Sequence, residues 1–186
     1  MELELIKQCL KEDRRAQETF YKICYARFIG TANRYATNKE QAVFFFNLGF
    51  VKLLMNLKQY NTENPFDYWA KRVLINTILN ELKKEKREQD RVLITDDWNS
   101  ISVNHHEADY EEELKAKMEL IKEKVQFLPP MTKNVFNLYA IDGYKHHEIA
   151  SMLDINENTS MWHYSDAKKK IRKLLELNEV ADGRLY

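Results

Sequence analysis

The sequence predicts an all-α fold made of two helical domains joined by a flexible linker. Apolar residues recur every three or four positions through most of residues 3–88, which is the spacing of amphipathic helices. The 186 residues include only 4 Gly and 3 Pro, too few for the many turns of an all-β fold. Across residues 91–110 the periodicity stops, and polar and acidic residues there indicate the linker.

Composition excludes several classes of protein. The longest apolar runs fall far short of the roughly 20 residues that cross a bilayer, so we expect no membrane insertion. The chain begins with early acids and lacks a cationic leader, which predicts a cytoplasmic protein. Lys and Arg total 29, as do Asp and Glu, so the net charge of zero neither favours nor excludes a polyanionic partner. Cys9 and Cys24 lie on apolar helical patterns and are expected to be buried, reduced thiols.

The first predicted domain covers residues 1–90. From Ala42 to Leu57 it is almost continuously apolar, which predicts a helix buried on several sides. Asn64 is suited to capping a helix and Pro65 to its first position, so a further helix should begin there and run past Lys84. The expected apolar positions of this helix are Phe66, Trp69, Val73, Asn76 or Thr77, and Asn80.

The second predicted domain covers residues 111–186. A helix over residues 111–127 should stop before Pro129, because proline lacks the donor that a continuing helix needs. Gly143 suits a left-handed helix end, and Asn156 can cap the last helix. The three shorter helices are expected over residues 132–141, 145–153 and 158–175.

These last helices have the pattern of a helix-turn-helix. Two helices that cross steeply need a small residue at their contact, here Ala150, and an apolar residue in the turn, here Ile155. In that arrangement the last helix can enter the major groove of DNA. An ordinary three-helix bundle with the same spacing is the alternative.

Several motifs stand out in both predicted domains. In the C-terminal one they are Leu128-Pro129-Pro130-Met131-Thr132-Lys133-Asn134-Val135-Phe136-Asn137-Leu138-Tyr139, Asp142-Gly143-Tyr144-Lys145-His146-His147-Glu148-Ile149-Ala150, and the basic stretch 167–175. In the N-terminal one they are Ala16 to Tyr21, Asn33-Arg34-Tyr35-Ala36, and Phe66-Asp67-Tyr68-Trp69-Ala70-Lys71-Arg72-Val73-Leu74-Ile75-Asn76. In these motifs and in their order, the chain resembles the extracytoplasmic-function RNA polymerase sigma factors over nearly its whole length.

The resemblance implies a sigma factor that directs core RNA polymerase to promoters. Residues 1–90 would be a sigma region 2-like domain that binds the polymerase and melts the minus-ten element, and residues 111–186 a sigma region 4-like domain that binds the minus-thirty-five element. The implied partners are core RNA polymerase, promoter DNA and an anti-sigma factor. No cofactor, metal or enzymatic activity is expected. The alternative is a divergent sigma-fold protein-interaction module or regulator that does not act as an active sigma factor.

The first domain supplies aromatic, amide and cationic side chains for single-stranded DNA. The candidate DNA-binding residues there are Tyr60, Asn61, Lys71, Arg72, Asn76, Asn80, Lys83, Lys84 and Arg87. Phe66 and Trp69 lie on the apolar stripe, where a core role competes with base stacking. The cations equally fit an ordinary solvated face, and Asn61 fits a turn.

The second domain offers its own contacts for duplex DNA. The candidates are Lys145, Thr159, Ser160, Trp162, His163 and Lys168. Lys145 and Lys168 would contact phosphates, whereas Ser160, Trp162 and His163 would meet base edges or a thymine methyl. For Trp162, packing in the core or against a partner is an equal alternative. Asp166 would repel nearby phosphate.

The helix expected to grip the polymerase departs from the family pattern. The family has acidic and amide residues there, whereas this chain has Gln41-Ala42-Val43-Phe44-Phe45-Phe46-Asn47-Leu48-Gly49-Phe50, without an acid. Charge complementarity would give way to an apolar contact. The candidate polymerase-binding residues are Phe44, Phe45, Asn47, Leu48 and Lys52. This departure is also what favours the interaction-module alternative.

Overall fold

A computed structural model describes residues 3–89 and 110–181, which form helices joined by short turns with no strand among them. The predicted all-α class is therefore confirmed. The chain divides into two compact units, Met1–Val92 and Leu93–Tyr186. The predicted linker lies outside the described residues, except for Tyr110, the first residue of α5.

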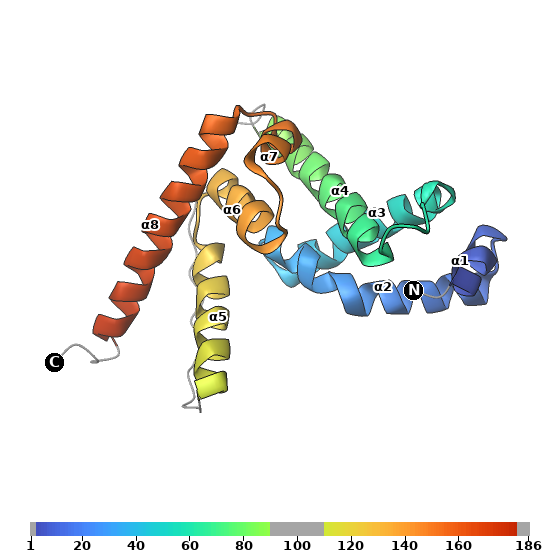
Figure 1. Ribbon diagram of the computed structural model, residues 1–186, viewed down its shortest axis with the longest axis horizontal. Helices are drawn as coiled ribbons and strands as arrows, with labels where there is room; N and C mark the ends of the chain where they lie inside the picture. The colour runs from blue at the N-terminus through green and yellow to red at the C-terminus, as the bar shows by residue number, and fades with distance from the viewer. Residues whose placement is uncertain (1–2, 90–109, 182–186) are drawn as a thin grey trace. The chain divides into compact units, whose positions relative to one another are not determined.

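Within residues 3–89, the N-terminal unit consists of four α-helices and one short 3-10 turn; Figure 1 labels the four helices. They are α1 (Leu3–Leu10), α2 (Arg14–Tyr35), α3 (Lys39–Asn56), η1 (Leu57–Gln59) and α4 (Phe66–Gln89). Side-chain carboxylate and amide oxygens cap two of them. Asp13 Oδ1 accepts the Ala16 N–H at 2.8 Å, and Asn38 Oδ1 accepts the Gln41 N–H at 2.8 Å.

Aromatic side chains fill much of the core of this unit. Phe20 of α2 is fully buried, with ring centroids 5.6 Å from Phe50 of α3 and 5.8 Å from Phe66 of α4. The tilted and edge-on geometries are the favourable ones for aromatic rings. Because one ring touches residues of two other helices, Phe20 ties α2, α3 and α4 together.

Two expectations for this unit were wrong. α3 is not buried on several sides: Phe45 and Phe46 are fully buried, but Phe44 is 46% exposed and Met55 68% exposed. On α4 the buried stripe does not include Asn76 and Asn80, which are exposed. The buried residues of α4 are Phe66, Ala70, Leu74, Ile75, Ile78 and Leu79. Leu74, Ile75, Ile78 and Leu79 offer far more apolar area than the asparagines, so the helix turns them inward.

The start of α4 lies one residue later than expected. The carbonyl oxygen of Pro65 accepts N–H groups from Tyr68 at 3.1 Å and Trp69 at 3.3 Å. Pro65 therefore stands at the boundary position just before the first helical residue, where its missing N–H costs nothing.

The C-terminal unit contains the expected helices, one of them ending in a wider turn. They are α5 (Tyr110–Gln126), α6 (Pro130–Phe136), the π-helical turn η2 (Asn137–Ile141), α7 (His146–Leu153) and α8 (Glu157–Ala181). In η2 the Asp142 N–H donates to the Asn137 carbonyl at 2.9 Å, which is the i to i−5 bond of a π turn. Gly143 then takes a positive φ of 77°, a left-handed conformation that glycine adopts without a steric cost.

The turn between α7 and α8 is closed by backbone and cap bonds. Asp154 is left-handed, and the N–H groups of Asp154 and Ile155 both donate to the carbonyl of Ala150. Asn156 caps α8 as predicted, its Oδ1 accepting the Thr159 N–H at 2.7 Å. Ala150 and Ile155 are half-buried at this corner. The α7–α8 pair is thus a helix-turn-helix.

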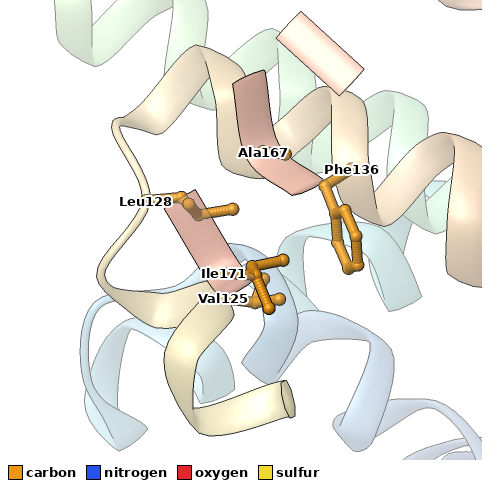
Figure 2. Packing of buried hydrophobic residues seen from close by; sticks show 5 residues of the cluster. All are labelled: Val125, Leu128, Phe136, Ala167 and Ile171. Atoms are coloured by element: carbon orange, nitrogen blue, oxygen red, sulfur yellow. The ribbon is translucent and has the colours of Figure 1, made fainter. Parts of the chain in front are cut away.

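One side of this unit is held by a small apolar cluster (Figure 2). It joins Val125 in the last turn of α5 and Leu128 in the turn that follows with Phe136 of α6 and with Ala167 and Ile171 of α8. Burial of these side chains fixes α8 against α5 and α6. The opposite face of α8 is left exposed.

Candidate nucleic-acid interface

A polar face runs along the outside of α4. Arg72, Asn76 and Asn80 are exposed and spaced by four residues, and Arg87 lies two turns further on. At about 100° per residue these four side chains fall on one side of the helix, away from the buried stripe. We call these four residues the α4 polar face. It combines two cations with two amides, the types that bind a nucleic-acid backbone and base edges.

The remaining cations predicted for α4 differ in exposure, in pairing and in their position around the helix. Lys84 is exposed, and its Nζ lies 3.5 Å from Glu81 Oε1, so part of its charge is neutralised locally. Lys83 is half-buried. Lys71 is exposed but lies about 140° around the axis from Asn76. Lys71 therefore does not belong to the α4 polar face.

An aromatic cluster lies at the N-terminal end of the α4 polar face. The Tyr60 ring centroid is 5.1 Å from that of Trp69 and 5.4 Å from that of Phe66. Tyr60 and Trp69 are half-buried, whereas Phe66 is buried, so a core role holds for Phe66. The Tyr60 hydroxyl donates to the Asn64 carbonyl at 2.7 Å, which holds this ring over the loop.

Asn61 forms the turn that leads into this cluster. Its Oδ1 accepts the Glu63 N–H at 2.9 Å, and its Nδ2 donates to Glu63 Oε2 at 3.1 Å. The exposed side chain is thus already engaged in a local turn, the alternative that its sequence context left open.

Two features of the N-terminal unit were missed by the sequence analysis. Tyr68 is 58% exposed in the first turn of α4, four residues before Arg72, and this spacing could have revealed it. The Asp67 carboxylate accepts a bond from Arg27 Nη1 of α2 at 2.9 Å, an ion pair across forty residues that no local pattern indicates. This pair links the start of α4 to α2.

An apolar strip lies on the outer side of α3. It comprises Phe44, Leu48, Val51 and Met55, spaced by four, three and four residues, and we call it the α3 apolar face. Leu48 is half-buried, and the other three are exposed. The heptad-like spacing was present in the sequence, although Val51 and Met55 were not among the predicted residues.

The other predicted polymerase-binding residues divide into two groups. Phe45 is fully buried, so no partner can reach it, and it is no longer a candidate polymerase-binding residue. Asn47 is exposed, and its Oδ1 accepts the Tyr21 hydroxyl at 3.0 Å, which fixes its orientation. Lys52 is exposed beside the α3 apolar face.

In the C-terminal unit, Ser160 and Thr159 serve the fold. Ser160 is fully buried, and its Oγ lies 2.9 Å from His146 Nδ1 of α7, so it is corrected from a base contact to a contact between helices. The Thr159 N–H and hydroxyl both donate to Asn156 Oδ1, at 2.7 and 2.9 Å. The hydrogen bonds of both side chains are therefore made within the helix-turn-helix itself.

The exposed candidates of this unit are Lys145, Trp162 and Lys168. Lys145 is exposed just before α7, and its backbone N–H donates to Glu148 Oε2 at 2.9 Å. Trp162 is 61% exposed. Lys168 is exposed and its Nζ lies 4.8 Å from the centroid of the Tyr164 ring, a cation–π contact.

A hydrogen-bonded chain joins α6 to α8. Thr132 Oγ1 lies 3.0 Å from His163 Nδ1 and 3.4 Å from Asp166 Oδ2, and Lys170 Nζ donates to the same carboxylate at 2.8 Å. Burial lowers the pKa of His163; Lys170 adds to this lowering, and Asp166 opposes it. Because Asp166 is paired with Lys170, its repulsion of phosphate is smaller than the sequence suggested.

Neither a metal site nor a membrane span is found in the described part of the chain. No group of three or more His, Cys, Asp and Glu residues there could hold a metal ion. The His105-His106 pair lies outside that part. Among the described helices, none has the length and apolarity needed to cross a bilayer.

Comparison with known proteins places this architecture in a class. The family described as Sigma-70, region 4 matches residues 118–171, from α5 into α8. RNA polymerase sigma-H factor of Pseudomonas aeruginosa is 21% identical over 179 residues, covering 93% of each chain. The sigma factor RpoE from Bartonella quintana, solved with the anti-sigma factor NepR, superimposes with a TM-score of 0.55 at 12% identity, covering 86% of this chain and 96% of that one. CnrH, solved with the cytosolic domain of CnrY, gives a TM-score of 0.48 at 16% identity, covering 93% and 96%.

The class is therefore that of all-helical proteins with a sigma-type helix-turn-helix at the C-terminus. Within that class, the chain resembles the extracytoplasmic-function RNA polymerase sigma factors over most of its length.

Proposed function

We propose that this chain is a sigma factor that binds core RNA polymerase in the cytoplasm and directs it to particular promoters. Residues 1–90 act as the region 2-like domain, and residues 111–186 as the region 4-like domain. Synthesis of RNA is the work of the polymerase, and the chain contributes recognition. The match to sigma-70 region 4 together with the likeness to a sigma-H factor supports the general role.

The single observation that carries the proposal for promoter melting is the α4 polar face. A base that has left the stack needs an aromatic platform, and the single strand needs a cationic track. Trp69 and Tyr60 stand half-exposed at one end of a row formed by Arg72, Asn76 and Asn80. The face is long enough to follow several nucleotides.

Polymerase binding is assigned to the α3 apolar face. A docking surface built from Phe44, Val51 and Met55 buries apolar area and needs few charges, which fits the missing acids of this helix. Lys52 and Asn47 would lie at its rim. The complex of RpoE with an anti-sigma factor is the reason to propose an anti-sigma factor as a further partner of this chain.

Transcription in vitro tests the proposal. Core polymerase and genomic DNA from the organism that encodes the chain are incubated with and without it, and the 5′ ends of the transcripts are sequenced. We expect a set of 5′ ends that depends on the chain and weakens with Asn76→Ala or Asn80→Ala. The matched control Lys22→Gln, on an exposed site of α2, should behave as wild type. Absence of both a polymerase complex and chain-dependent 5′ ends would refute the proposal.

A second candidate function is that of an interaction module that uses the sigma fold without starting transcription. The exposed α3 apolar face favours it, since the same strip could bind another protein. Capture of core polymerase by the wild-type chain and by Phe44→Asp separates the two. Loss of capture with Phe44→Asp, but not with Leu3→Asp on exposed α1, supports the sigma factor; wild-type chain that captures no polymerase supports the module.

A further inference from the structure

The outer face of α8 changes character along its length. Opposite the buried residues Ser160, Ala167 and Ile171, the first half of the helix exposes uncharged side chains and the second half exposes cations. The uncharged residues are Asn158, Met161, Trp162 and Ser165, and the cations are Lys168, Lys169, Arg172 and Lys173. Two exposed acids border this face: Glu157, the first residue of the helix, precedes it, and Glu176 follows the cations.

Trp162 is the largest exposed side chain on the uncharged half. A neighbouring ring, that of His163, helps to fix its orientation. The His163 ring lies edge-on to the indole, with centroids 4.9 Å apart and planes at 72°. His163 is in turn fixed by the 3.0 Å contact between its Nδ1 and the hydroxyl of Thr132, which is 2% exposed. An orientation that exists before binding reduces the entropy lost on binding.

The uncharged half lacks the side chains that usually read guanine. Arg or Lys paired with guanine O6 and N7 is the commonest specific contact in the major groove, and neither residue occurs among the exposed positions from Asn158 to Ser165. Apolar side chains can instead contact the 5-methyl group of thymine. Met161 and Trp162 are 46% and 61% exposed, which leaves apolar area to cover such a methyl.

We propose, resting on the proposed function, that Trp162 with Met161 is the specificity-determining contact of the C-terminal domain and selects duplex DNA that presents thymine methyl groups. His163 is a positioning residue for Trp162 and does not touch the DNA. The cations from Lys168 to Lys173 contact phosphates and set affinity without reading sequence. Duplex DNA, and not a protein, is the occupant because the apolar residues continue on the same helix face into four cations that suit a polyanion.

The test removes single methyl groups from DNA. Duplexes are first selected from a randomised pool by the full chain bound to core polymerase and, in parallel, by the full chain alone. The upstream part of a selected duplex is then remade with deoxyuridine at one thymidine at a time. We expect at least one replacement to weaken binding about fourfold, the effect of uncovering one methyl-sized apolar group. Trp162→Ala should bind the thymidine duplex more weakly by a similar factor and no longer distinguish the two duplexes.

Two further variants distinguish sequence recognition from sequence-independent binding to DNA. Lys169→Gln should weaken binding to both duplexes equally and keep the discrimination. Thr132→Val, which removes the hydroxyl that holds His163, should reduce the discrimination, and Thr132→Ser should restore it. Thermal unfolding of each variant verifies that the domain is folded.

The outcomes that overturn the inference are separate from those that overturn the sigma factor role. Selected duplexes that bind equally with deoxyuridine at every position would overturn the inference alone. The same holds if Trp162→Ala weakens capture of core polymerase while leaving DNA discrimination intact, because the face would then dock a protein. If neither pool is enriched, the proposed function fails and the inference fails with it.

Discussion

Gly49 of α3 packs directly against Leu74 of α4. A Cβ atom built on Gly49 would lie 2.1 Å from Leu74 Cδ1 and 3.4 Å from Leu74 Cα. The distance to Cα is an ordinary contact, so the overlap is with the Leu74 side chain, which is fully buried and would have to move within the packed core. Glycine is required here because it lets two helices of the N-terminal unit approach each other.

Gly49→Ala is therefore expected to destabilise the N-terminal unit by about 1–3 kcal/mol, the usual cost of overfilling a core. Urea unfolding of the full chain measures this change. Gly30 provides the matched control, because it lies inside α2 and a Cβ atom added to it would meet nothing within 4 Å. Gly30→Ala should raise the free energy of unfolding by about 0.5–1 kcal/mol, since alanine favours a helix interior. Equal effects of the two substitutions would contradict this packing argument.

Local sequence was enough to predict the helices and several of their ends. Pro129 and Pro130 mark the break between α5 and α6, Gly143 takes the expected left-handed conformation, and Asn156 caps α8. Each of these is decided by the residue itself and its immediate neighbours. Such signals do not depend on the rest of the fold.

The phase of a helix is harder to predict where apolar residues are abundant. Three consecutive phenylalanines, Phe44, Phe45 and Phe46, point about 100° apart from one another, so a single buried side cannot take all three. Only the neighbouring helices decide that Phe44 is the exposed one. On α4 two apolar stripes compete, and tertiary packing selects the one that excludes Asn76 and Asn80.

Contacts between distant residues were beyond the reach of sequence patterns. Ser160 and His163 look like reading residues on the last helix, yet their partners are His146 and Thr132, fourteen and thirty-one positions away. Nothing local to α8 signals those pairs. The candidate site was therefore predictable as a helix, but not residue by residue.

The two cysteines should not react in the folded protein. Burial raises the pKa of Cys24 to about 12, and burial with the nearby Asp13 raises the pKa of Cys9. The thiolate is the nucleophile, and its population at neutral pH is then very small. Alkylation followed by mass spectrometry should find both thiols unmodified in native protein and modified in urea. Rapid labelling of Cys24 in native protein would contradict its buried position.

Stability of the C-terminal unit should decrease below the ordinary histidine pKa of about 6.5. The folded pKa of His163 is lowered, so above 6.5 the residue is neutral in both states and imposes no penalty. As pH falls toward the folded pKa, the unfolded chain binds the proton first, and unfolding is favoured. His163→Asn keeps a hydrogen-bonding group near Thr132 but does not titrate. The stability difference between wild type and this variant should shift against wild type on acidification, as followed by urea unfolding; a constant difference would refute the assignment.

Binding of promoter DNA should depend on salt partly through the α4 polar face. If Arg72 contacts one phosphate, its replacement by glutamine removes one released counterion. The slope of log affinity against log salt should then become shallower by about 0.7 to 0.9, the lower value applying to single-stranded DNA. The measurement uses the polymerase complex and a duplex that it selects, titrated over several salt concentrations. Lys22→Gln removes a cation that is paired with Glu18 on the outside of α2, so it should leave the slope unchanged. A slope that responds equally to both substitutions would mean that total charge, and not the α4 polar face, sets the electrostatic contribution.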